Sequence, residues 1–130
     1  MSDASTPQPQ LLVVEDNPET RFLMDRILGR DYEVTTASTP AEALQAMREA
    51  AFVAVLLDIN LGADQTGVEV MEAARQYPGY DKVPIVACTA YAMPGDAERF
   101  LGLGFDGYIS KPFTRATLQR ALDDATGNAG

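Results

Sequence analysis

Val53-Ala-Val-Leu-Leu-Asp58-Ile-Asn60 is the stretch that decides the fold class of this chain. Five apolar residues run without interruption into a carboxylate, and an amide follows two positions later. A short, unbroken apolar run of this kind predicts a strand buried on both faces, as in a parallel sheet covered by helices. Asp58 would then lie at the carboxyl edge of the sheet, where open α/β folds bind their ligands.

Strand-like runs recur along the chain, and most of them end in a polar or charged group. The predicted strands are 11–14, 32–37, 53–57, 84–89 and 107–110. The first ends in the acidic pair Glu15-Asp16, the fourth ends in Thr89, and the last leads into Lys111. The second run is β-branched and alternating, which is typical of a strand nearer the edge of a sheet.

Helix start signals lie between these strands. Asn17-Pro18-Glu19 supplies an N-cap, a proline at the first helical position and an early acid. The helix that follows places Phe22, Leu23 and Ile27 on one face at near-helical spacing. Thr39-Pro40-Ala41-Glu42 has the pattern of a capping box and predicts a second helix. Further helices are predicted at 68–76, 94–103 and 114–125.

Five strand–helix units in a row define the architecture. Such regular alternation predicts an α/β fold, with a five-stranded parallel sheet, right-handed crossovers and five helices on both faces. In a parallel sheet every strand delivers its carboxyl end to the same edge. The acids, the threonine and the lysine should therefore converge in space although they are scattered in the sequence.

Length and composition exclude several classes of function. The 130 residues suit one domain at 11–126, between a disordered arm at 1–10 and a short tail at 127–130. The net charge of −9 argues against a nucleic-acid or anionic-membrane surface. The chain has no histidine, which removes zinc-hydrolase and Ser-His-Asp chemistry. The single cysteine, and the lack of a signal pattern or an apolar run of spanning length, favour the cytoplasm.

The predicted cluster suits one kind of chemistry. Carboxylates held close together repel one another and raise each other's pKa unless a cation lies among them. Magnesium, or manganese, prefers oxygen ligands and needs only one or two carboxylates plus a phosphate oxygen. A carboxylate can also attack phosphorus to give an aspartyl phosphate, and a lysine can neutralise the phosphoryl oxygens. The strand ends therefore indicate metal-assisted phosphoryl transfer.

The set Glu15-Asp16-Asn17, Asp58, Thr89-Ala90 and Lys111-Pro112 resembles the receiver domain of two-component response regulators. The segments 89–96 and 104–113 are similar to single-domain regulators and to receivers of hybrid sensor kinases. This resemblance, not the residue pattern, implies a flavodoxin-like strand order of 2-1-3-4-5.

The resemblance also implies a role for each residue at the metal site. Asp58 would be the phosphoacceptor. Asp16 would bind magnesium directly and Glu15 mainly through water, while Asn60 would offer its backbone carbonyl.

On the phosphate side, the resemblance implies that Thr89 and Lys111 each contact a phosphate oxygen. Tyr108 would turn inward when Thr89 is drawn to the phosphate. The Lys111-Pro112 peptide bond would be cis, which proline permits at small cost.

We therefore expect a phosphorylation-controlled switch in a two-component system or phosphorelay. A histidine kinase or histidine phosphotransfer protein would donate the phosphoryl group, and a contact near the fourth helix and fifth strand would carry the output. The chain would be a stand-alone regulator that catalyses only its own phosphorylation and dephosphorylation, without a small-molecule cofactor, nucleic-acid partner or membrane contact.

Other interpretations of the same pattern remain open. The chain could be a receiver excised from a hybrid histidine kinase, or a constitutive binding adaptor that does not use phosphate. A phosphatase with an aspartyl nucleophile generally needs a second acid two residues later, where this chain has Asn60. A flavin-binding version of the fold is disfavoured because no phosphate-cradling loop follows the first strand.

Overall fold

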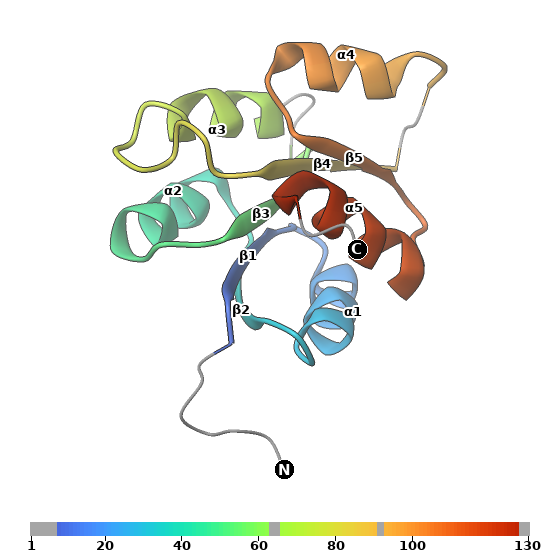
Figure 1. The fold of residues 1–130 in the computed structure, drawn as a ribbon, viewed down its shortest axis with the longest axis horizontal. Helices are drawn as coiled ribbons and strands as arrows, with labels where there is room; N and C mark the ends of the chain where they lie inside the picture. Colours follow the sequence, from blue (N-terminus) through green and yellow to red (C-terminus); the bar gives the residue numbers. More distant parts are fainter. Residues whose placement is uncertain (1–7, 63–65, 91–92, 128–130) are drawn as a thin grey trace.

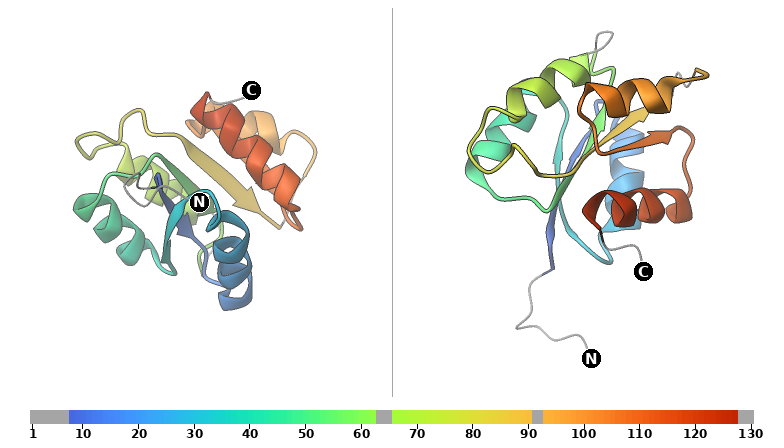
Figure 2. Two further views of the ribbon diagram at one scale, coloured as in Figure 1. Left: turned by 60° about the horizontal axis from the view of Figure 1, so that its bottom comes forward. Right: turned by 45° about the horizontal axis from the view of Figure 1, so that its top comes forward.

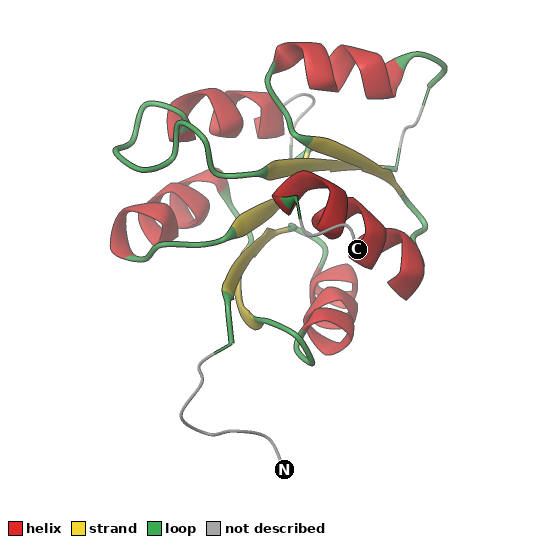
Figure 3. Ribbon diagram, in the orientation of Figure 1, coloured by secondary structure: helices red, strands yellow, loops and turns green. Residues whose placement is uncertain are grey.

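Strands and helices alternate along the whole chain in the computed structural model, which describes residues 8–62, 66–90 and 93–127 (Figure 1; Figure 3). The strands are β1 Gln10–Val14, β2 Glu33–Ala37, β3 Ala54–Asp58, β4 Ile85–Thr89 and β5 Gly107–Ser110. The helices are α1 Pro18–Leu28, α2 Pro40–Glu49, α3 Thr66–Ala74, α4 Asp96–Leu103 and α5 Arg115–Thr126. Every predicted element is present, with boundaries that move by at most a few residues.

The five strands form one parallel sheet in the order β2-β1-β3-β4-β5. This confirms the expected order and places β2 at an edge of the sheet, as its alternating sequence predicted. The register sets Val14 opposite Leu57 and Asp58 opposite Cys88. The carboxyl ends of β1, β3 and β4 therefore lie side by side, since neighbouring parallel strands end at the same edge.

Helices cover both faces of the sheet, as Figure 2 shows. One apolar cluster packs α2, α3 and α4 against the sheet, and the other packs α1 and α5. Alternate residues of the central strands belong to the two clusters in turn. Leu56 faces α1 and α5, whereas Leu57 faces α2, α3 and α4. Both side chains are fully buried. This two-sided burial explains why β3 reads as a continuous apolar run.

The apolar residues at near-helical spacing in α1 do not all lie on its inner face. Phe22 and Leu23 are 62% and 47% exposed, whereas Met24 and Leu28 are buried against the sheet and Ile27 is half-buried. The helix begins at Pro18, where the Asn17 side chain accepts a hydrogen bond from the Thr20 amide. Packing against the sheet then selects Met24 and Leu28, which lie one turn apart, as the inward pair.

Some predicted segments lie partly outside the described residues. These are 1–7 of the expected arm, 63–65 of the loop after β3, and 128–130 of the tail. Gln10, which was assigned to the arm, is instead the first residue of β1. In the part of the chain that the structure describes, every helix is too short or too polar to cross a bilayer.

Candidate functional site

Three carboxylates meet at the carboxyl edge of the sheet. Glu15 and Asp16 follow β1, and Asp58 ends β3. Each offers a carboxylate oxygen, and these oxygens all lie within 4.8 Å of one another. Glu15 and Asp58 are buried, with 2% and 6% of their surface exposed, while Asp16 is exposed. The cluster is thus reached from solvent on the Asp16 side.

Lys111 follows the edge strand β5 and joins this cluster at the same carboxyl edge of the sheet. Its Nζ lies 2.5 Å from Glu15 Oε1 and 3.5 Å from Asp58 Oδ2. Its backbone amide donates to the Thr89 carbonyl, which ties it to the end of β4. The Lys111-Pro112 peptide bond is cis, as expected. The structure therefore gathers the predicted acids and the predicted lysine at one point.

Backbone amides hold the two buried carboxylates in place. The Asn17 amide donates to Glu15 Oε2 at 3.1 Å, and the Asn60 amide donates to Asp58 Oδ1 at 3.1 Å. One oxygen of each carboxylate is thus bound to the backbone, and the other lies toward Lys111. The predicted role of the Asn60 carbonyl as a metal ligand stays a prediction.

Electrostatics at the site favour an added cation. Burial, and then the charge of Glu15, raise the pKa of Asp58 from 3.8 to about 7, although Lys111 opposes the shift. Burial would lower the pKa of Lys111, but its hydrogen bond to Glu15 and the charge of Asp58 outweigh this and raise it. The single lysine therefore leaves the acidic cluster under-neutralised. A divalent cation would relieve the repulsion between Glu15 and Asp58, which adds to the effect of burial on the Asp58 pKa.

The raised pKa of Asp58 predicts an effect of pH on stability. In chelator-treated protein, Asp58→Asn should be more stable than wild type at pH 8, by on the order of 1–3 kcal/mol. The folded state holds the Asp58 proton more tightly than the unfolded chain does, so ionisation between about pH 4 and 7 destabilises the wild-type fold. The advantage of the variant should shrink toward pH 5. Urea unfolding at both pH values measures it, and an advantage that grows on acidification would contradict the prediction.

The predicted phosphate contacts lie on the neighbouring strands. Thr89 is buried at the end of β4, one residue beyond the partner of Asp58 in the register. The Tyr108 ring stacks on Phe100 of α4, with centroids 5.8 Å apart and planes at 19°. Its hydroxyl is buried and has no hydrogen-bond partner among the described residues. Tyr108 is therefore turned inward in this structure, and its role in switching remains a prediction.

Gly67 is a site residue that the sequence analysis did not single out. It is the second residue of α3 and lies directly against the end of β3, and its amide donates to the Ile59 carbonyl at 2.6 Å. A Cβ at this position would collide with the Asp58 carbonyl oxygen and would lie 2.7 Å from the Ile59 Cα. Only glycine allows the helix to approach the backbone of the acceptor this closely.

Gly67→Ala should therefore destabilise the protein by about 2–3 kcal/mol, because backbone atoms must move to make room for the methyl group. Thermal or urea unfolding measures the change. Gly102→Ala is the matched control: a Cβ there meets no atom within 4 Å. That control should be neutral or stabilising by about 0.5–1 kcal/mol, as is usual in a helix interior. Equal effects of the two substitutions would refute the close-approach argument.

The fold and this site define the class of protein. A doubly wound parallel sheet carries an acidic pair, a buried aspartate and a lysine at its carboxyl edge. The family model of the response regulator receiver domain matches residues 11–123. The chain belongs to this family, and it is a receiver domain of two-component signalling.

Its relatives include both free-standing regulators and parts of kinases. The chain is 32% identical to the polar-differentiation response regulator DivK of Brucella ovis, over 92% of this chain and 97% of that protein. It is 28% identical to the signal transduction histidine-protein kinase BarA of Escherichia coli K12, and this match covers 94% of this chain. The matched region is only 13% of the length of that kinase.

A solved structure gives the comparison of folds. The receiver domain of sensor histidine kinase PA1611 from Pseudomonas aeruginosa superimposes with a TM-score of 0.81 at 33% identity. The match covers 92% of this chain and 98% of that one, and that structure has a magnesium ion coordinated in its active-site cleft.

Proposed function

We propose that this receiver domain is a phosphorylation-dependent switch that accepts a phosphoryl group on Asp58. One observation carries the proposal: a buried carboxylate lies within reach of two further acids and a lysine that come from separate strand ends. This arrangement is costly when nothing binds there, because it raises the pKa of Asp58 to about 7. A module that only bound another protein would gain nothing from it.

The donor set fits magnesium. The cluster supplies carboxylate oxygens alone, and hard divalent cations prefer oxygen ligands. Asp16 would bind the ion directly, and Glu15 would bind it through water. Asp58 and the Asn60 carbonyl would be the other protein ligands. Exposed Asp16 leaves room for the several waters that magnesium keeps. When bound, the ion would neutralise the charge that accumulates on the phosphoryl oxygens.

The chain's own residues would carry the transfer. One Asp58 oxygen forms a bond to phosphorus while the phosphorus–nitrogen bond of a phosphohistidine breaks, and the electron pair of that bond stays on the imidazole nitrogen. The Asn60 amide holds the other Asp58 oxygen and so orients the attacking one. Lys111 Nζ, 3.5 Å from Asp58, is placed to pair with a phosphoryl oxygen, and Thr89 would donate its hydroxyl to another.

A partner protein would supply the phosphohistidine, since this chain contains no histidine. Receiver domains interact with histidine kinases or phosphotransfer proteins. A depression of about 450 Å³ lies beside Lys111, lined by Thr20 and Leu23 of α1 and by Ala90, Pro112 and Phe113. Its mainly apolar walls next to the acceptor support docking of such a donor on this side. The half-exposed Leu23 on its rim is then part of a contact surface.

Phosphorylation would change partner binding through the face formed by α4 and β5. Drawing Thr89 toward the phosphate alters the space beside Tyr108, which already lies against Phe100 of α4. The domain would act in the cytoplasm, without a small-molecule cofactor, and would catalyse only its own phosphorylation and dephosphorylation. Free-standing regulators and hybrid kinases both occur among its relatives. We propose the free-standing role, with a receiver of a larger kinase as the alternative.

Incubation with acetyl phosphate and Mg²⁺, followed by intact-mass measurement, tests the proposal. The protein should gain the mass of one phosphoryl group, and hydroxylamine should remove it, as expected of an acyl phosphate. A chain that gains no mass with or without Mg²⁺ would instead be a constitutive adaptor.

A further inference from the structure

Arg21 of α1 reaches back to the turn that carries the acidic pair. Its Nη1 donates to the carbonyl oxygen of Glu15 at 2.9 Å and to that of Asp16 at 3.3 Å. The Arg21 side chain is half-buried. Further bonds hold the same turn: the Glu15 amide donates to the Ala37 carbonyl, and the Asn17 amide donates to the Glu15 carboxylate.

We propose that Arg21 is a positioning residue of the divalent-cation site. This inference rests on the proposed function, because it assumes that Asp16 and Glu15 hold a cation. By binding both carbonyl oxygens, the guanidinium group keeps them from turning toward the ion and leaves the carboxylates as the ligands. It also restricts the turn, so Asp16, which is otherwise exposed, is held near Asp58.

The charge of Arg21 and its hydrogen bonds have opposite effects on cation binding. A positive charge beside the acidic cluster repels a second cation, so charge alone predicts that removing Arg21 tightens metal binding. Loss of the hydrogen bonds frees the turn and weakens binding. Outer-shell partners of metal ligands typically contribute about 10–100-fold to metal affinity. We therefore expect the positioning effect to outweigh the repulsion, and the sign of the change distinguishes the two.

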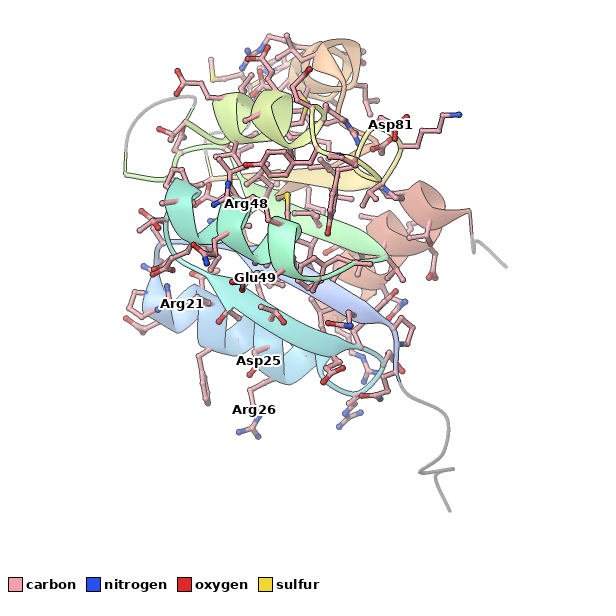
Figure 4. The ribbon with its side chains drawn as sticks, turned by 90° about the vertical axis from the view of Figure 1, so that its left-hand side faces the viewer. Arg21, Asp25, Arg26, Arg48, Glu49 and Asp81 are labelled. Atoms are coloured by element: carbon pink, nitrogen blue, oxygen red, sulfur yellow. The ribbon has the colours of Figure 1, made fainter. Side chains whose placement is uncertain are left out.

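The experiment compares Mn²⁺ and Mg²⁺ dissociation constants, measured by calorimetric titration, in wild type, Arg21→Met, Arg21→Lys and Arg26→Met. Arg26 is the matched control: it lies on the same helix, projects away from the sheet in Figure 4, and its guanidinium rests 5.6 Å from the Phe22 ring centre. Arg21→Met should bind about 10–100-fold more weakly than wild type. Arg21→Lys should recover part of the loss, since lysine can donate to one carbonyl at a time. Arg26→Met should bind as wild type does or slightly more tightly.

Unchanged or tighter metal binding by Arg21→Met would overturn the inference. If an unchanged dissociation constant came with a lowered unfolding temperature, the role of Arg21 would be purely structural. Failure of the proposed function looks different, because wild type itself would then bind neither Mn²⁺ nor Mg²⁺. Circular dichroism before each titration establishes that every variant is folded.

Discussion

Asp58→Asn should abolish phosphoryl incorporation completely. The amide has nearly the same shape and its oxygen can still accept the hydrogen bond from the Asn60 amide, so the site should remain assembled. An amide lacks the nucleophilic oxygen that attacks phosphorus, however, and no acyl phosphate can form. Intact mass after incubation with acetyl phosphate and Mg²⁺ measures the result: wild type gains one phosphoryl group and the variant gains none.

Asp25→Asn is the control for this substitution, because it makes the same change on an exposed position of α1 (Figure 4). It should be phosphorylated like wild type. Undiminished and hydroxylamine-sensitive labelling of Asp58→Asn would show that another carboxylate accepts the phosphoryl group. Peptide mapping of the labelled protein would then identify that residue.

Asp16→Ala should remove the dependence of phosphorylation on Mg²⁺ together with most of its rate. Asp16 is the exposed member of the cluster and the carboxylate that we expect to bind the ion directly. We expect a loss of more than about 100-fold, since an outer-shell partner alone contributes about 10–100-fold to a metal site. Initial rates of phosphorylation over a series of Mg²⁺ concentrations measure the effect.

Glu19→Ala is the control for this second substitution, because it removes an exposed acid from the first turn of α1. It should leave the Mg²⁺ dependence as it is in wild type. If Asp16→Ala kept the wild-type dependence instead, Asp16 would not be a ligand, and the metal site would have to be assigned to Glu15 and Asp58 alone.

Local signals in the sequence were enough to predict the fold class, whereas the strand order came from the family resemblance. The proline and cap residues marked where α1 and α2 begin, and the apolar run before Asp58 marked a strand buried on both faces. The convergence of acids and lysine also followed, because parallel strands end at one edge of their sheet. The apolar residues Phe22 and Leu23 do not mark the inner face of α1, because both are exposed while Met24 and Leu28 pack against the sheet.

The sequence by itself thus determined the order of the elements, the parallel sheet and the edge at which the polar residues meet, since these depend on short-range pattern and on topology. Only the tertiary structure decided which atoms meet there. The Lys111–Glu15 pair joins residues 96 positions apart, and the close approach of Gly67 to the Asp58 backbone and the Arg21 contacts depend on how helices pack on strands. The raised pKa of Asp58 likewise comes from burial and a neighbouring charge. The distances between these groups arise from the packing of the whole chain, and no local pattern encodes them.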